Sequence, residues 1–333
     1  MTRIALLVAL AGCGFRITPG SNTGDGGPSD GDMQVDGADA DATTPTDAPV
    51  DGPLQPTCLL AWLNQTITFQ SAAQLASLSS TSYDRDPFVS VDELTIWFSN
   101  GGATSQGGGD VFKATRATRA QPFGAPARDP DFSTSGGAES KMSMTQDRLF
   151  AVVASSQSGG AGGSDIWETS RPTSNAAWGP ISRSHTSGLA TAGSELDPFI
   201  NSDGLRLYYS PTSPSPQRIM VAKRASLSEV FASPTEVGGV NSGSGEWDPT
   251  LIANDRVIIF ASDRTSSNGS GNLWYATRAT GDAAFGTPLE VPGVNTDFDE
   301  GDAHVSADGC HIYFSRDVGG GVDWELFSAA ATP

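Results

Sequence analysis

The chain has 333 residues, and its composition excludes several classes of protein. Asp and Glu total 38 against 19 Lys and Arg, so the formal net charge is −19. Such a chain lacks the basic side chains that displace counterions from a phosphate backbone, which excludes nucleic acid as a partner. With 39 Gly and 21 Pro residues, it favours turns over long helices. Three cysteines are too few for a disulfide scaffold or a Cys-rich zinc module.

Residues 1–12 predict a lipoprotein signal peptide. Arg3 supplies a positive charge, and the apolar run at 4–10 is too short to span a bilayer. The run ends in Leu-Ala-Gly-Cys13, which resembles the lipobox of bacterial lipoproteins. That resemblance implies that Cys13 is diacylated and becomes the mature N-terminus in the cell envelope. Because Gly14 and not Asp follows the cysteine, the resemblance favours the outer membrane, on its periplasmic or surface side. The alternative is an ordinary signal peptide with an incidental cysteine.

Residues 13–56 predict the lipidated cysteine followed by a disordered linker. Positions 14–56 contain eight Asp and one Arg and offer almost nothing to bury in a core. The alternating carboxylates at 30–32 and 39–41 are similar to those of calcium loops, but no bidentate Glu follows them. We therefore expect an extended segment whose like charges repel one another.

From residue 57 onward the sequence repeats five times, and the repeat predicts the fold. Each copy has an Asp-Pro-like pair, and eleven residues after the Pro-type position comes an apolar residue. These apolar positions are 54, 57, 51 and 54 residues apart and are occupied by Phe98, Val152, Tyr209, Phe260 and Phe314. In this alignment the second copy departs most, with Lys141 at the Pro-type position and Arg148 in place of the turn glycine.

Each copy predicts four short antiparallel strands. A hairpin with a turn such as Asp203-Gly204 is followed by a Gly/Ser-rich loop and a third strand. Thirteen residues after the start of that strand comes an aromatic residue, which we expect to open the fourth strand; these residues are Phe123, Trp178, Phe231 and Phe285. Four such strands are the blade of a β-propeller, so residues 57–333 predict an all-β propeller of five four-stranded blades. A sixth blade would need a degenerate copy that the sequence does not show.

The fifth copy lacks its fourth strand before Pro333, and the N-terminal segment supplies a candidate. Phe69 precedes Asp86 by 17 residues, the same spacing by which Phe123, Phe231 and Phe285 precede the next copy. We therefore expect the strand around Phe69 to lie beside Glu325–Phe327 and to complete the last blade.

This closure also predicts a disulfide between Cys58 and Cys310. Cys310 follows the first turn of blade five, and Cys58 precedes the returning strand, so both lie on the side of the ring that carries the first turns. A periplasmic compartment permits disulfides. The alternative is a pair of free buried thiols.

The repeat resembles the WD40-like β-propeller repeat of the TolB type. The closest stretches are Asp197–Tyr209 and Asp165–Arg171, and the resemblance covers about residues 66–330. It implies the fold and leaves the function open, because propellers of this type include binding platforms, scaffolds and domains attached to enzymes.

The recurring carboxylates are the main candidate site. Fivefold symmetry would gather near one mouth of the channel the carboxylates that begin the first strand of each copy; these are Asp84 and Asp86, Glu195 and Asp197, Glu246 and Asp248, and Glu300 and Asp302. They would either bind a cation such as calcium, the one cofactor considered, or cap backbone N–H groups of their own loops. A zinc site formed by His304, Cys310 and His311 has no evident fourth ligand.

Together these features predict a lipid-anchored envelope protein that binds a protein, peptide or glycan through one face of the propeller. Trp247 is the candidate surface-binding residue, because it lies between Glu246 and Asp248 in a predicted loop. Trp97, Trp167 and Trp274 are expected to pack between blades. The alternative function is an envelope glycoside hydrolase or lyase, because five-bladed propellers also carry such enzymes. No catalytic residue is assigned, because the carboxylates follow the repeat and no nucleophile or metalloprotease motif is present.

Overall fold

The computed structural model describes residues 56–102, 105, 107–266, 271–321 and 323–332. The predicted signal peptide, the lipidation site at Cys13 and the linker up to residue 55 lie outside the described residues. The described residues belong to one compact unit. No helix in the described part of the chain is long and apolar enough to cross a membrane.

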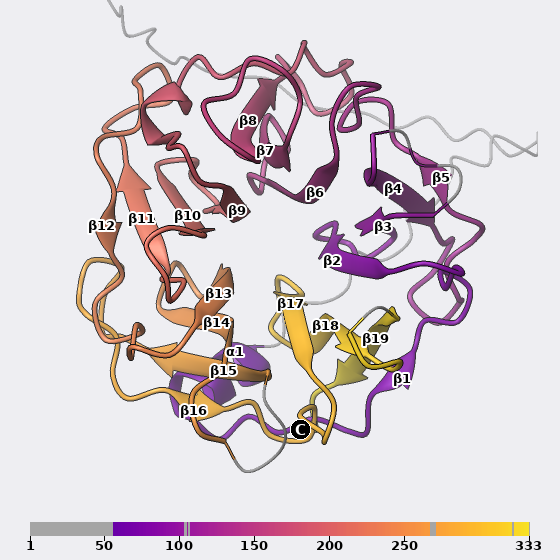
Figure 1. Cartoon of the computed structure of the whole chain (residues 1–333). Coiled ribbons are helices and arrows are strands. Elements are labelled where there is room, and N and C mark those ends of the chain that lie inside the picture. The colour runs from indigo at the N-terminus through magenta and orange to yellow at the C-terminus, as the bar shows by residue number, and fades with distance from the viewer. Residues whose placement is uncertain (1–55, 103–104, 106, 267–270, 322, 333) are drawn as a thin grey trace, which may run out of the picture. The chain divides into compact units, whose positions relative to one another are not determined.

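Five antiparallel sheets follow one another around a ring, and the first strand of each sheet lies nearest the centre (Figure 1). These inner strands are β2 (Asp84–Val89), β6 (Glu139–Met144), β9 (Glu195–Ile200), β13 (Glu246–Ile252) and β17 (Glu300–Val305). We call the sheets that begin with them blades 1 to 5. The five-bladed β-propeller predicted from the repeat is confirmed.

The second and third strands of each blade continue outward by antiparallel pairing. The second strands are β3 (Thr95–Asn100), β7 (Phe150–Ser155), β10 (Arg206–Pro211), β14 (Val257–Ser262) and β18 (His311–Asp317). The third strands are β4 (Asp110–Thr115), β8 (Asp165–Ser170), β11 (Met220–Lys223), β15 (Asn272–Thr277) and β19 (Trp324–Ala330). The turn between β9 and β10 contains Gly204 at φ +73°, a conformation that glycine adopts without strain.

The fourth strands are shorter than expected. They are β5 (Ala127–Arg128), β12 (Thr235–Glu236) and β16 (Leu289–Glu290), and in blade 2 the described residues show only a bridge between Glu168 and Ser182. The prediction that the aromatic residue opens this strand is wrong, because the aromatic lies four residues earlier. Its ring is buried beneath an arginine instead, as in Arg116 over Phe123 at 4.3 Å and Arg278 over Phe285 at 4.2 Å.

The ring closes by pairing segments from both ends of the described chain. The short strand β1 (Ala73–Gln74) pairs with β19, with Ala73 opposite Ser328 and Gln74 opposite Phe327. Phe69 forms a separate antiparallel bridge with Ala331. The predicted closure of the last blade is confirmed, but Phe69 itself lies beyond Glu325–Phe327, and the paired strand begins four residues after it.

A short helix before this closure was not predicted. Helix α1 (Pro56–Leu63) contains Trp62, which is fully buried and donates a hydrogen bond from its indole Nε1 to the Gly309 carbonyl over 2.9 Å. The same helix carries Cys58, whose Sγ is 2.05 Å from that of Cys310, with the two Cα atoms 5.3 Å apart. The structure therefore joins the two cysteines that the sequence paired, and the disulfide connects α1 to the first turn of blade 5.

Candidate functional site

A bulge in every inner strand places one residue against the channel axis. The pairing register shifts at this point in all five blades, for example between Arg85 and Phe88 in β2. The bulged residue has a positive φ in each blade, and these residues are Asp86 (58°), Lys141 (22°), Asp197 (57°), Asp248 (56°) and Asp302 (56°). Asp tolerates this conformation better than most residues with a side chain, which gives the recurring Asp a backbone reason.

The register of the second blade corrects the sequence alignment by one residue. Lys141 occupies the position of the bulged Asp, not that of the Pro, and Glu139 occupies the position of Asp84. Blade 2 therefore contributes an ammonium group where the other four blades contribute a carboxyl group. We call the four bulged aspartates together with Arg85 and Lys141 the channel cluster.

Hydrogen bonds connect the channel cluster from blade to blade. The backbone N–H of Asp302 donates to Asp248 Oδ2 over 2.9 Å, and that of Asp248 donates to Asp197 Oδ2 over 3.5 Å. The backbone N–H of Lys141 likewise donates to Asp86 Oδ2 over 3.2 Å. Each of these carboxylates thus caps an N–H of the next blade, not one of its own loop.

The capping of each blade's own loop is done by an acidic residue two positions earlier. Glu246 Oε2, for example, accepts a hydrogen bond from the Ser242 backbone N–H over 3.1 Å. The equivalent carboxylates accept from the backbone of Ser80, Thr134, Thr191 and Thr296 and belong to Asp84, Glu139, Glu195 and Glu300. The expected capping of each blade's own loop is therefore confirmed for Asp84, Glu195, Glu246 and Glu300. It is wrong for the bulged aspartates, because these neighbouring acids already satisfy the loop N–H groups.

Two cations partly neutralise the four aspartates. Arg85 Nε lies 2.8 Å from Asp302 Oδ2, and Lys141 Nζ lies 3.9 Å from Asp248 Oδ1. Lys141 is only 4% exposed, and its ammonium has no hydrogen-bond acceptor among the described residues. If all four carboxyls were ionised, the channel cluster would hold two more negative charges than positive ones.

This excess of negative charge and the two cations shift the pKa values of the aspartates in different directions. Burial and the negative charge of Asp302 raise the pKa of Asp86 to about 7. Burial and the neighbouring carboxylates Asp197 and Asp302 raise the pKa of Asp248 well above its ordinary value. Burial would also raise the pKa of Asp302, but Arg85 and Lys141 hold that pKa well below the usual range. Protonated and ionised carboxyl groups therefore lie side by side near neutral pH.

The cluster has oxygens close enough to be ligands of one cation. Single carboxylate oxygens of Asp86, Asp197 and Asp248 all lie within 4.8 Å of one another, and oxygen ligands suit calcium. However, the Lys141 ammonium lies beside Asp248 and would repel a cation bound there. The chain therefore already provides an internal positive charge where a bound cation would have to lie.

A cavity of about 600 Å³ opens onto the channel cluster. The four aspartates line it together with three aromatic side chains, Tyr83, Trp247 and Trp324. Trp247 lies within β13 and is half-buried, whereas the sequence placed it in an exposed loop. Tyr83 and Trp324 were not predicted to be site residues, although each directly precedes an acidic residue at the start of a strand. The Arg85 guanidinium lies over the Trp324 ring at 4.1 Å.

The remaining candidates lie elsewhere. Trp97, Trp167 and Trp274 are buried in the cores, as expected. The structure does not bring His304, Cys310 and His311 into one ligand group. His304 packs on Phe88 with ring centroids 4.5 Å apart, and Cys310 forms the disulfide. Among the described residues, His311 instead lies near Glu93 and Asp308.

Comparison with known proteins supports the propeller fold but assigns the chain to no family. No protein-family model matches the sequence, and no curated protein matches it. Among solved structures, the α-L-arabinofuranosidase PaAbf62A from Podospora anserina is 11% identical with a TM-score of 0.52, over 80% of this chain and 96% of that one. The catalytic domain of a GH62 α-L-arabinofuranosidase from Coprinopsis cinerea is 12% identical with a TM-score of 0.52, over 80% and 97%. TolB from Acinetobacter baumannii is 16% identical with a TM-score of 0.47, over 77% of this chain and 56% of that one.

Proposed function

We propose that this propeller is an envelope protein that binds a carbohydrate in the cavity above the channel cluster. The observation that carries the proposal is the lining of that cavity, where four carboxyl groups and an arginine meet three aromatic side chains. Sugars present hydroxyl groups that both donate and accept hydrogen bonds, and C–H faces that pack on aromatic rings. A cavity of about 600 Å³ has the size of an ordinary small-molecule site.

The four carboxyls suit sugar hydroxyls because all of them line the cavity, although Asp86, Asp248 and Asp302 are largely buried. Asp197 is the half-exposed member of the four aspartates, so it is the carboxyl best placed to accept hydrogen bonds from a ligand. Trp247 and Trp324 supply apolar surface nearby, and such rings commonly provide much of the contact area in a binding site. Two of the solved structures that share the fold are described as α-L-arabinofuranosidases, which act on sugars and agree with this choice of ligand class.

Cleavage of a glycosidic bond is the second candidate function, and the divergent pKa values favour it. Glycoside hydrolases use one protonated and one ionised carboxyl group, as Asp248 and Asp302 would provide. The existing contacts of these two carboxyls argue the other way. Asp248 Oδ2 accepts the backbone N–H of Asp302 over 2.9 Å, and Asp302 Oδ2 is paired with Arg85 Nε over 2.8 Å, so both groups are already engaged within the protein. Binding therefore stays the first proposal.

The test is a thermal-shift screen of the purified domain against a glycan panel, followed by titration of the best glycan. W247A should weaken binding by about tenfold, because the variant loses an aromatic wall of the cavity. W178A is the matched control, since Trp178 is also half-buried and lies under Arg171 outside this cavity. Release of reducing sugar from the bound glycan, abolished in D248N, would establish the second candidate instead. Absence of binding across the panel would contradict the proposal.

We also propose that Cys13 carries the lipid that holds the protein at the outer membrane, with the Asp-rich segment as its tether. The support is the sequence around Cys13 and the disulfide, which fits an oxidising compartment. Mass spectrometry of the mature N-terminus should find a diacylated cysteine. The C13S variant should lose the lipid and leave the membrane fraction, and an unmodified N-terminus in the wild type would contradict the anchor.

A further inference from the structure

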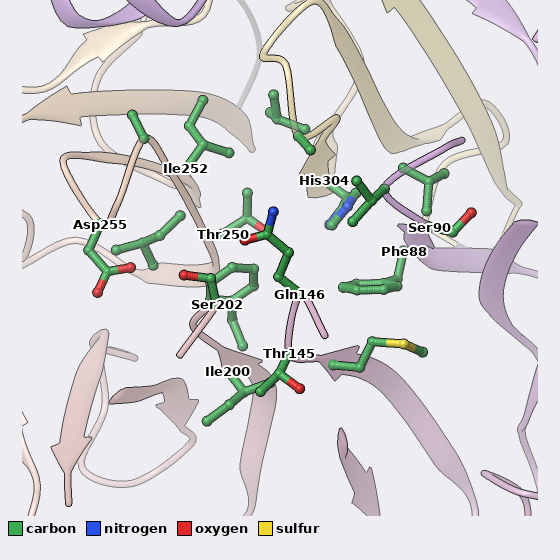
Figure 2. Close-up of a pocket in the computed structure, with 18 of the residues that line it drawn as sticks. Phe88, Ser90, Thr145, Gln146, Ile200, Ser202, Thr250, Ile252, Asp255 and His304 are labelled. Atoms are coloured by element: carbon green, nitrogen blue, oxygen red, sulfur yellow. The ribbon is translucent and has the colours of Figure 1, made fainter. Parts of the chain in front are cut away.

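A second cavity lies at the other end of the channel, on the face that carries the first turn of each blade. Its volume is about 250 Å³, and it shares no lining residue with the cavity above the channel cluster. Each blade contributes apolar side chains to it, including Phe88, Met144, Ile200, Leu251 and Val305. Figure 2 shows Phe88, Ile200, Ile252 and His304 surrounding this one space.

The position of this cavity follows from strand geometry. Alternate residues of a strand point to the same side, so the residue two positions after each bulged residue is the next to approach the channel. The residues at this second level are Phe88, Ser143, Phe199, Thr250 and His304. Blade 4 has a threonine at this level where blades 1 and 3 have phenylalanines, and Phe88, Phe199, Thr250 and His304 all line the cavity.

Among the described residues that line this cavity, Thr250 is the one with a buried side-chain polar atom that has no hydrogen-bond partner. Its side chain is 1% exposed, and its Oγ1 makes no hydrogen bond in the described part of the chain. The other buried hydroxyls of the lining are engaged within their own turns. Ser90 Oγ donates to Asp92 over 2.5 Å, and Thr145 Oγ1 donates to Asp147 over 2.6 Å. A buried hydroxyl without a partner is unfavourable in the free protein, and a ligand group could satisfy it.

The inside of the cavity carries no charge. His304 is neutral at physiological pH, because burial and the Lys141 ammonium lower its pKa to about 3. The charged residues of the lining, Arg148 and Asp255, lie in the turns that follow the inner strands of blades 2 and 4, and Asp255 is buried there. Asp255 is paired with Asn201 at 2.9 Å and with Arg206 at 3.2 Å. A charged ligand would therefore lose its hydration without gaining a counter-ion inside.

We propose that this cavity is a second binding site, for a neutral small molecule with one apolar ring and one hydroxyl group that pairs with Thr250 Oγ1. The volume agrees with a single ring, since an apolar cavity of about 150 Å³ is enough to hold benzene. The site is independent of the proposed carbohydrate site, because the two cavities have separate linings.

The test compares benzyl alcohol with toluene, which has the same ring without the hydroxyl, by NMR titration of the purified protein. The wild type should bind benzyl alcohol about fivefold more tightly than toluene, the ratio expected from one hydrogen bond. T250V keeps the shape of the side chain and should lose this preference, binding toluene at least as tightly as benzyl alcohol, because the hydroxyl of the alcohol is then buried without a partner. An unchanged preference in T250V, or no binding of benzyl alcohol to the wild type at millimolar concentration, would overturn the proposal.

Two further measurements separate the site from general effects on folding. Without ligand, T250V should melt at a higher temperature than the wild type, because the unpaired hydroxyl is removed; a lower melting temperature would mean that the hydroxyl already has a partner. A307W should block both ligands, because Ala307 is an exposed turn residue that lines the cavity. V230W is the control, since Val230 is exposed and lines neither cavity. Equal binding by A307W and V230W would place the ligand elsewhere and contradict the site.

Discussion

The backbone N–H of Asp302 donates a hydrogen bond of 2.9 Å to the carboxylate of Asp248 and so joins blades 5 and 4 at the channel. The same contact recurs between Asp248 and Asp197 and between Lys141 and Asp86. The recurring Asp thus connects one repeat to the next. Its conformation fits the bulge, and its carboxyl group is available to the neighbouring blade. The channel cluster therefore links neighbouring blades and also lines the cavity above it.

The pair formed by Arg85 and Asp302 should contribute strongly to stability. D302N should lower the free energy of unfolding by about 3 kcal/mol, because removing one partner leaves the other charge uncompensated in a largely buried place. The control is D282N, because Asp282 pairs with Arg206 and Lys223 on the surface and should change stability by less than about 0.5 kcal/mol. Urea denaturation measures both variants. Equal stability of D302N and D282N would show that the buried pair does not hold the blades together.

The disulfide between Cys58 and Cys310 should also contribute strongly to the stability of the fold. Its cysteines are 252 residues apart, and in the chain-entropy model a loop of this length stabilises the fold by about 5 kcal/mol. The double variant C58S/C310S should therefore unfold at a clearly lower urea concentration. Adding a reductant to the wild type should reproduce the shift and leave the double variant unaffected. A wild type insensitive to reductant in the unfolding transition would argue against this role.

The raised pKa of Asp86 predicts a pH dependence of stability. The pKa is about 7 in the folded protein, against about 3.9 for an unfolded Asp. Between these values the folded state holds a proton that the unfolded state has released, so stability falls as the pH rises from about 4 to 7. Asp197 and Asp248 act in the same direction.

D86N is the variant that isolates this effect. Its amide does not titrate, so its melting temperature should fall less steeply than that of the wild type between about pH 4 and 7. Asp302 has a lowered pKa and acts at lower pH, where its stabilising charge is lost on acidification. Parallel melting curves for D86N and the wild type across this range would contradict the assignment of the raised pKa to Asp86.

The number of blades and their closure were predictable from the sequence, because strand pairing imposes a fixed spacing on every repeat. The 17-residue interval before Asp86 identified Phe69 as part of the missing strand, and the structure moves the pairing only to Ala73–Gln74. Helix α1 was not predictable in the same way. Its eight residues have no helical hydrophobic period to recognise, and contacts distant in sequence hold it, namely the disulfide and the Trp62–Gly309 hydrogen bond.

The candidate site was predictable in part. Symmetry alone indicated that the four aspartates converge, but the role of Lys141 was hidden because blade 2 lacks the Asp-Pro signal. Glu139 would have corrected the register, since it stands where the other blades have their loop-capping acid. Tyr83 and Trp324 reach the cavity from loop-side ends of strands, and their approach to Trp247 depends on how the blades pack. The spacing of the repeat predicts the strands within each blade, but it does not predict which side chains from different blades come together.

The most direct test of the central claim is calorimetric titration of the best glycan into the wild type, D197N and E236Q. Asp197 lines the cavity above the channel cluster, whereas Glu236 lies on the surface in a pair with Arg218. D197N should bind about tenfold more weakly, and E236Q should bind as the wild type does. Equal affinity for all three proteins would show that the glycan binds away from this cavity and would contradict the proposed function.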